Sequence, residues 1–184
     1  MTTANKLTIM RIALIPVFLV VLYLDFAGAR WWALGIFIVA CLTDFADGYI
    51  ARHYNQITNF GKFMDPLADK MLVMAAMCYF VECGQMPGWC LAIVLLREFA
   101  VSGMRLVAVE QGRVIAAGKL GKIKTSLQMV TLVLYLLSSC GATLFAPVAE
   151  IMMWAAVLMT VWSGVDYFVK NREVLHDGGS KPGV

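Results

Sequence analysis

Six apolar segments, each close to the length of a membrane-spanning helix, constrain the fold of this chain more than any other feature. A helix needs about 20 consecutive apolar residues to cross the hydrocarbon core of a bilayer. Hydrophobic residues make up 61% of the 184 residues, well above the roughly 45–50% of soluble domains. We therefore predict an all-α, polytopic membrane protein with six transmembrane helices. The segments cover residues 9–25, 32–51, 66–83, 88–109, 122–143 and 147–169.

The connections between these segments are short, and the sequence shows no internal repeat or low-complexity tract. We predict one domain over residues 1–184. The stretch 176–184 ends in D-G-G-S-K-P-G-V, a composition typical of a disordered tail. Five cysteines lie mostly within or at the ends of apolar segments without C-x2-C spacing, which predicts neither a disulfide framework nor a zinc site.

Basic residues gather in alternate connections and predict the orientation of the chain. They lie at the N-terminus, around the second and fourth connections and after the last segment, whereas the other connections carry only Arg30. Because cytoplasmic loops carry an excess of Lys and Arg, we expect both termini on the cytoplasmic side of the cell membrane. The net charge of +3 is too small to predict a nucleic-acid partner.

Four aspartates lie beside or inside these apolar segments, in D-F-A-D-G-Y-I-A-R, which begins at Asp44, and G-K-F-M-D-P-L-A-D, which ends at Asp69. An unpaired carboxylate inside a membrane costs at least a few kcal/mol, so these acids need partners. On a helix, Asp44 and Asp47 share one face. Asp65 precedes Pro66 and is predicted to be a helix N-cap, with Asp69 one turn further in. Two carboxylate pairs form an all-oxygen cluster, which suits Mg²⁺ or Mn²⁺ better than Zn²⁺.

Small residues and one arginine accompany the acids. Gly48, Ala51 and Gly61 would let a flat substrate approach the helix backbone closely. Arg52 could bind a phosphate with its planar fork of donors. Together with the acids, these residues predict a metal site that handles phosphates at the cytoplasmic face.

The same stretch resembles the signature of the CDP-alcohol phosphotransferase family, D-x2-D-G-x2-A-R-x8-G-x3-D-x3-D. Agreement at every fixed position of this pattern is very specific. The matching residues are Asp44, Asp47, Gly48, Ala51, Arg52, Gly61, Asp65 and Asp69.

This resemblance implies a six-helix membrane enzyme, typically a homodimer, that transfers a phosphatidyl group from CDP-diacylglycerol to an alcohol and releases CMP. It implies two divalent ions, Mg²⁺ or Mn²⁺, on the four aspartates, with Asp69 also the general base for the acceptor hydroxyl. It further implies that the donor nucleotide and its phosphates are bound by Gly48, Ala51, Arg52 and Gly61.

Charged residues in the fourth and fifth segments form a second group. Arg97 and Arg105 lie within the fourth segment, where intramembrane charges are candidates for a functional site. The alternative is a structural role, in which Glu98 is the internal counter-ion that holds one of the arginines in place. Lys122 and Lys124 open the fifth segment, where lysines often anchor a helix at the interface. The patterns R-E-x6-R and G-K-x-K-T-x2-Q resemble the acceptor region of phosphatidylglycerophosphate synthases. That resemblance implies that these four basic residues bind the phosphate of sn-glycerol 3-phosphate.

Four polar residues are weaker candidates for substrate contacts. Ser102 stands between the two arginines of the fourth segment, and Thr125 follows the lysines of the fifth. Thr8 and Arg11 lie in L-T-x2-R, which resembles the opening of the same synthases, although capping and headgroup anchoring explain them equally well. The basic start and the A-G-A at 27–29 also fit a cleavable signal peptide, which is the alternative for this end.

Other functions stay open on the sequence. A sister phosphotransferase could use inositol phosphate, serine or phosphatidylglycerol as acceptor, and the basic residues favour an acceptor that carries phosphate. A small cation transporter is the alternative from another class, because carboxylates at helix ends also mark ion pathways. Transporters commonly show inverted repeats, which this sequence lacks.

Overall fold

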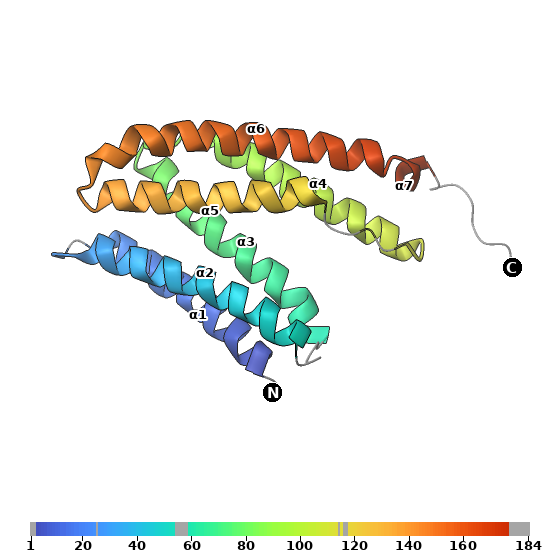
Figure 1. Cartoon of the computed structure of the whole chain (residues 1–184), viewed down its shortest axis with the longest axis horizontal. Helices are drawn as coiled ribbons and strands as arrows, with labels where there is room; N and C mark the ends of the chain where they lie inside the picture. The colour runs from blue at the N-terminus through green and yellow to red at the C-terminus, as the bar shows by residue number, and fades with distance from the viewer. Residues whose placement is uncertain (1–2, 25, 54–58, 114, 116–117, 177–184) are drawn as a thin grey trace, which may run out of the picture.

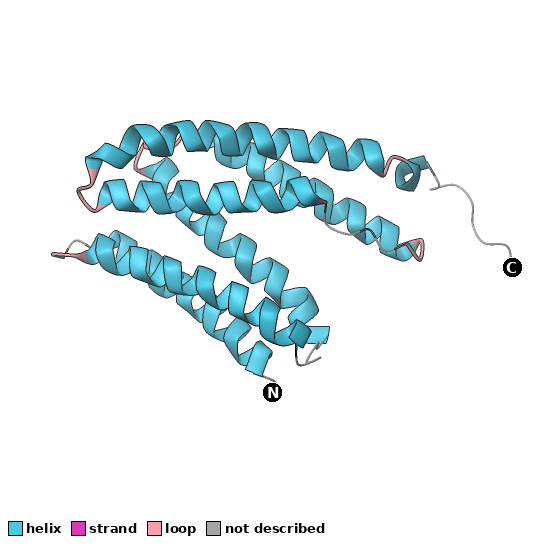
Figure 2. Cartoon of the chain, in the orientation of Figure 1, coloured by secondary structure: helices cyan, strands magenta, loops and turns pink. Residues whose placement is uncertain are grey.

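The computed structural model describes residues 3–24, 26–53, 59–113, 115 and 118–176. Side chains are not described at 3–7, 44–53, 59–63, 65–66, 69 and 175–176. The described residues form helices, turns and loops without a strand, as Figure 2 shows, which confirms the predicted all-α class. The long helices are α1 (Thr3–Tyr23), α2 (Ala29–His53), α3 (Asn59–Glu82), α4 (Gly88–Glu110), α5 (Lys119–Ser139) and α6 (Ala146–Lys170).

Two short elements flank the last long helix. A 3-10 turn, η1 (Thr143–Phe145), leads into α6, and α7 (Glu173–His176) follows it. His176 therefore ends a helix, and the remainder of the predicted disordered tail, residues 177–184, lies outside the described residues.

The prediction that Asp65 caps a helix is wrong. The helix α3 begins at Asn59, so that Asp65 and Pro66 lie inside it. An interior proline lacks the N–H donor of its turn and disfavours a helix by about 3 kcal/mol. Here α3 packs against α1, α2, α4 and α5, and we attribute its continuation through Pro66 to these contacts. Pro16 lies inside α1 in the same way.

The six long helices form one bundle (Figure 1). The helices α1 and α2 run antiparallel and pack on each other, as do α5 and α6, and α3 crosses between these two pairs. The helix α4 packs on α3 and α6. Because successive helices alternate in direction, the start of α5 and the ends of α4 and α6 meet at one end of the bundle.

The main core contains side chains from all six long helices and does not extend to the end of the bundle near α7. Phe18 of α1 packs on Phe37 of α2 with ring centroids 5.7 Å apart, and Phe80 of α3 packs on Tyr135 of α5 at 5.1 Å. A second, smaller core lies between α4, α6 and α7. Its buried members are Val101, Met104, Ala108, Tyr167 and Val174.

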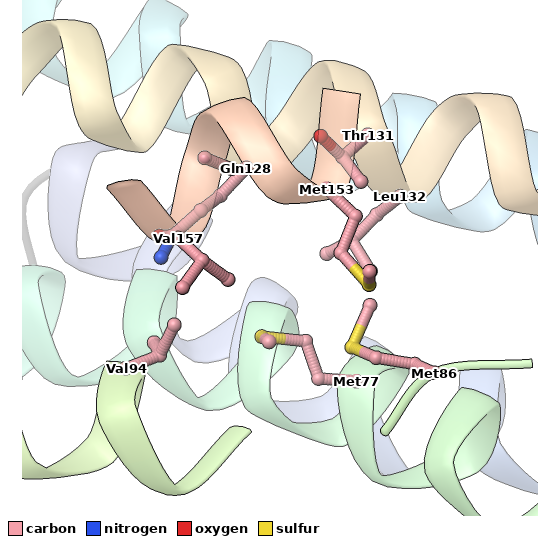
Figure 3. A pocket seen from close by; sticks show the side chains of 9 residues that line it. Met77, Met86, Val94, Gln128, Thr131, Leu132, Met153 and Val157 are labelled. Carbon is pink, nitrogen blue, oxygen red and sulfur yellow. The ribbon is translucent and has the colours of Figure 1, made fainter. Parts of the chain in front are cut away.

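A small void in the main core is lined mainly by apolar side chains (Figure 3). Met77, Met86 and Met153 converge on it from three sides, and Gln128 and Thr131 reach it from α5. Its volume of about 10 Å³ is close to the smallest that holds one water molecule. The void is therefore a packing feature and leaves no room for a substrate.

Two stretches of the described residues are long and apolar enough to cross a membrane, Lys119–Ser139 and Thr143–Lys170. Two shorter apolar helices, Thr8–Tyr23 and Ala29–Thr43, accompany them. Large apolar side chains also face outward along the bundle. On α4, Leu96, Phe99 and Leu106 are 64–72% exposed, which is a poor surface for contact with water.

Candidate functional site

The signature residues lie on α2 and α3, two consecutive helices that pack on each other. Residues 44–52 belong to the last turns of α2, and Gly61, Asp65 and Asp69 belong to the first half of α3. All of their side chains lie outside the described residues, so the metal and donor contacts stay predictions. Among the side chains that are described, no group of three or more His, Cys, Asp or Glu could hold a metal.

A pocket of about 470 Å³ opens beside α3, at the end of the bundle where α4, α5 and α6 meet. Three of the four basic residues predicted to bind the acceptor line it: Arg97, Arg105 and Lys122. Lys70 of α3 supplies a fourth cation, against two acids, Glu98 and Asp166. Asp166 forms an ion pair at 2.8 Å with Lys170, which does not line the pocket. The pocket thus has a cationic wall suited to a small anion.

Glu98 is the counter-ion of this wall. Its carboxylate accepts hydrogen bonds from Arg97 at 2.9 Å and from Lys124, and it forms an ion pair with the Lys70 ammonium at 3.3 Å. The interpretation of Glu98 as an internal counter-ion is therefore confirmed, with two lysines added to the arginine. Its side chain is 8% exposed and that of Lys124 is 4% exposed. One carboxylate shared by three cations leaves net positive charge at the pocket.

The Arg97 side chain lies close to two glycines, Gly121 of α5 and Gly164 of α6. A Cβ atom added at Gly164 would lie 3.2 Å from its Cγ, and one added at Gly121 would lie 3.3 Å from its Nη2. Contacts this short are tighter than ordinary van der Waals packing. The absence of side chains at these two glycines therefore makes room for the arginine. Its Nε atom is buried without a hydrogen-bond partner among the described residues.

Arg105 lies against Tyr167 of α6. Its Nε donates to the Tyr167 hydroxyl at 3.2 Å, and its guanidinium carbon is 5.6 Å from the centroid of the ring. Tyr167 is buried in the second core. The position of the Arg105 guanidinium thus depends on a buried side chain of α6.

The remaining predicted residues lie in two places. Lys124 lines a second, smaller cavity of about 50 Å³, which shares Lys70 and Glu98 with the main pocket. Thr125 lines both cavities and donates to the carbonyl of Gly121 at 3.1 Å, whereas Ser102 accepts from Lys70 at 2.9 Å. Thr8 and Arg11 are completely buried on α1 and line neither cavity.

Sequence reasoning missed several residues of the pocket, and Lys70 and Tyr167 are the two that contact its charged side chains. Lys70 is one of the basic residues around the second connection, which predict only the orientation of the chain, yet its contacts with Glu98 and Ser102 join α3 to α4. Its position directly after Asp69 was the available signal. Tyr167 carried no signal in the sequence, because a tyrosine near the end of an apolar helix is typical of the membrane interface.

These observations define a bundle of apolar helices with a pocket at one end whose lining is rich in cationic side chains. The chain belongs to the CDP-alcohol phosphatidyltransferase family, whose sequence model matches residues 1–162. The match covers the signature residues and the arginines of α4, and it ends just before the residues of α6 that line the pocket.

Several relatives are similar over most of their length. A protein from Bacillus subtilis named CDP-diacylglycerol–glycerol-3-phosphate 3-phosphatidyltransferase is 44% identical, with 93% of this chain and 95% of the relative aligned. Proteins of the same name from Rickettsia bellii and Salmonella paratyphi A are 39% and 38% identical. Those alignments cover 89% and 93% of this chain, and 92% and 95% of the relatives.

Proposed function

We propose that this protein transfers the phosphatidyl group of CDP-diacylglycerol to sn-glycerol 3-phosphate, giving phosphatidylglycerophosphate and CMP. The names of relatives at 38–44% identity support both substrates. The single structural observation that supports glycerol 3-phosphate as the acceptor is the cationic pocket. Arg97, Arg105 and Lys122 all line this one space of about 470 Å³. A small dianion such as glycerol phosphate matches this charge, whereas serine does not.

The membrane setting is part of the same proposal. The apolar helices and the outward apolar side chains of α4 support a protein with six transmembrane helices. The positive-inside rule puts both termini and the pocket on the cytoplasmic side of the cell membrane. The diacylglycerol tails of the donor would then stay in the bilayer. We also propose a homodimer, as the family resemblance implies.

The donor would be bound next to this pocket by the last turns of α2 and the first half of α3. Asp44, Asp47, Asp65 and Asp69 offer only carboxylate oxygens, a donor set that fits Mg²⁺ or Mn²⁺. A divalent ion held there would neutralise the pyrophosphate of the donor and stabilise departing CMP. Arg52 would hold the donor phosphates, and the neighbouring small residues Gly48, Ala51 and Gly61 would leave room for the nucleotide.

The reaction is a displacement at phosphorus. The acceptor hydroxyl attacks the phosphorus that carries diacylglycerol, an O–P bond forms, and the P–O bond to CMP breaks with its electron pair on CMP. Asp69 would take the proton of the hydroxyl. Lys70, the next residue, lines the acceptor pocket through its contacts with Glu98 and Ser102. The proposed base is therefore on the helix segment that borders the acceptor, as a general base must be.

The assay that tests this proposal follows CMP release from CDP-diacylglycerol by the purified protein in detergent with Mg²⁺ or Mn²⁺. Glycerol 3-phosphate, inositol phosphate, serine and phosphatidylglycerol are compared as acceptors. We expect release with glycerol 3-phosphate alone. Release with one of the other acceptors would keep the family chemistry but overturn the proposed acceptor, and no release with any of them would overturn the transferase proposal.

Kinetics of a variant test the pocket itself. We expect Arg105→Ala to raise KM for glycerol 3-phosphate at least about tenfold, because the loss of one charge-assisted hydrogen bond weakens binding by roughly this factor. KM for CDP-diacylglycerol should stay nearly unchanged. Arg172→Ala is the matched control, because Arg172 is exposed beyond the end of α6 and does not line the pocket. An equal rise in both KM values for Arg105→Ala would indicate a structural role instead.

A further inference from the structure

The helix α6 contributes residues 163–167 to one side of the pocket region, and this stretch contacts both arginines. Gly164 lies against the Cγ of Arg97, and Tyr167, three residues later, holds Arg105. Residues three apart on a helix point to nearly the same side. Both residues are buried on the inner face of α6. The turn therefore sets the positions of two cations from a single rigid element.

Each contact restricts its arginine in a different way. At Gly164 the restriction is steric, because the atom that approaches closely is Cγ, in the middle of the arginine side chain, rather than its flexible end. A methyl group at this position would push the stem of Arg97 aside. At Tyr167 the restriction is directional, because the hydroxyl accepts from Nε while the ring lies beside the guanidinium. With Nε satisfied by Tyr167, the two terminal nitrogens of Arg105 stay available for the oxygens of an anion.

We propose that Gly164 and Tyr167 are positioning residues for the acceptor's phosphate, acting through Arg97 and Arg105 respectively. The inference rests on the proposed function and extends it to a helix turn that lies beyond the family match at residues 1–162. Neither residue touches the reacting atoms in this proposal. Their effect should therefore fall on acceptor affinity and leave the chemical step unchanged.

Two substitutions test the proposal. Tyr167→Phe keeps the ring and removes only the hydroxyl, and Gly164→Ala adds one methyl group. We expect each to raise KM for glycerol 3-phosphate about two- to tenfold, the range for a lost hydrogen bond or a small misplacement. We expect kcat and KM for CDP-diacylglycerol to stay within about twofold of the parent values.

Matched controls exist for both changes. Gly103→Ala adds the same methyl on α4, where a Cβ would meet nothing within 4 Å. Tyr23→Phe removes a hydroxyl that bonds with Glu82, at the other end of the bundle. Neither control should change KM for the acceptor.

Double variants separate a positioning role from a general structural one. If Tyr167 acts through Arg105, adding Tyr167→Phe to Arg105→Ala should raise KM for glycerol 3-phosphate no further. Likewise, if Gly164 acts through Arg97, adding Gly164→Ala to Arg97→Ala should leave this KM unchanged. Unchanged KM in the single variants, or effects that add fully in the double variants, would overturn the inference while leaving the proposed function intact.

A binding measurement keeps the two proposals distinguishable. Inorganic phosphate should raise the Tm of the parent protein, and raise it less in Tyr167→Phe and Gly164→Ala. If the parent did not use glycerol 3-phosphate at all, the proposed function would fail. The positioning role would then be supported by a smaller phosphate-induced shift in the variants, and overturned by an equal shift.

Discussion

Glu98→Gln is the perturbation whose effect follows most directly from the structure. The Glu98 carboxylate contacts Lys70, Arg97 and Lys124, and the Lys124 side chain is only 4% exposed. A glutamine fills the same space but removes the negative charge, so that a buried ammonium loses its counter-ion beside two other cations. Breaking a buried ion pair by removing one partner costs about 3–5 kcal/mol. We expect about 3 kcal/mol here, because Lys70 is 30% exposed and water relieves part of the repulsion.

The assay is thermal unfolding of the purified protein in detergent. For a chain of this length, about 3 kcal/mol corresponds to a fall in Tm of about 6–12 °C. Asp166→Asn is the control, since its partner Lys170 is 69% exposed and such surface pairs contribute about 0.5 kcal/mol or less. Glu98→Gln/Lys124→Met should lose less than the sum of the two single changes. A Tm for Glu98→Gln within about 1 °C of the parent would refute the assignment of Glu98 as the counter-ion.

Further predictions concern the signature and the orientation. Replacing any one aspartate of the signature by asparagine should abolish CMP release from folded protein. Near-normal turnover would contradict the proposed metal site. The variants are Asp44→Asn, Asp47→Asn, Asp65→Asn and Asp69→Asn. A chelator should likewise stop CMP release, and excess Mg²⁺ or Mn²⁺ should restore it, whereas full activity in the chelator would exclude a metal requirement. Cys83 is exposed in the turn after α3, on the side predicted to face outward. A membrane-impermeant thiol reagent should label Cys83 on intact cells, with Cys83→Ser as control. Labelling only after the membrane is opened would show that the predicted orientation is wrong.

The helices and the signature could be predicted from the sequence because both depend on local information. Apolar segments of bilayer length predict helices, since every backbone group in such a segment must be hydrogen bonded within it. The helix ends were less predictable. Asp65 before Pro66 is a typical helix start, yet α3 begins at Asn59. Packing against four neighbouring helices is a tertiary effect that no local pattern reports.

The pocket shows the same division. Arg97, Glu98 and Arg105 could be singled out by the sequence alone, because charges inside an apolar segment are rarely incidental. The contacts that these side chains make could not be predicted from the sequence. Lys122 and Lys124 are two residues apart and looked equivalent in the sequence. In the bundle, Lys122 lines the pocket and Lys124 is buried against Glu98, because residues two apart on a helix point in different directions.

By itself the sequence determined an all-α chain, a family signature and the charged residues of a predicted phosphate-binding region. Only the tertiary structure decided which of those charges share a space and what holds them there. Lys70 and Tyr167 belong to the pocket because α3 and α6 pack beside α4, and Gly164 matters because it faces Arg97. Such contacts join residues up to 67 positions apart in the chain, as from Arg97 to Gly164, and depend on helix packing, which local sequence patterns do not encode.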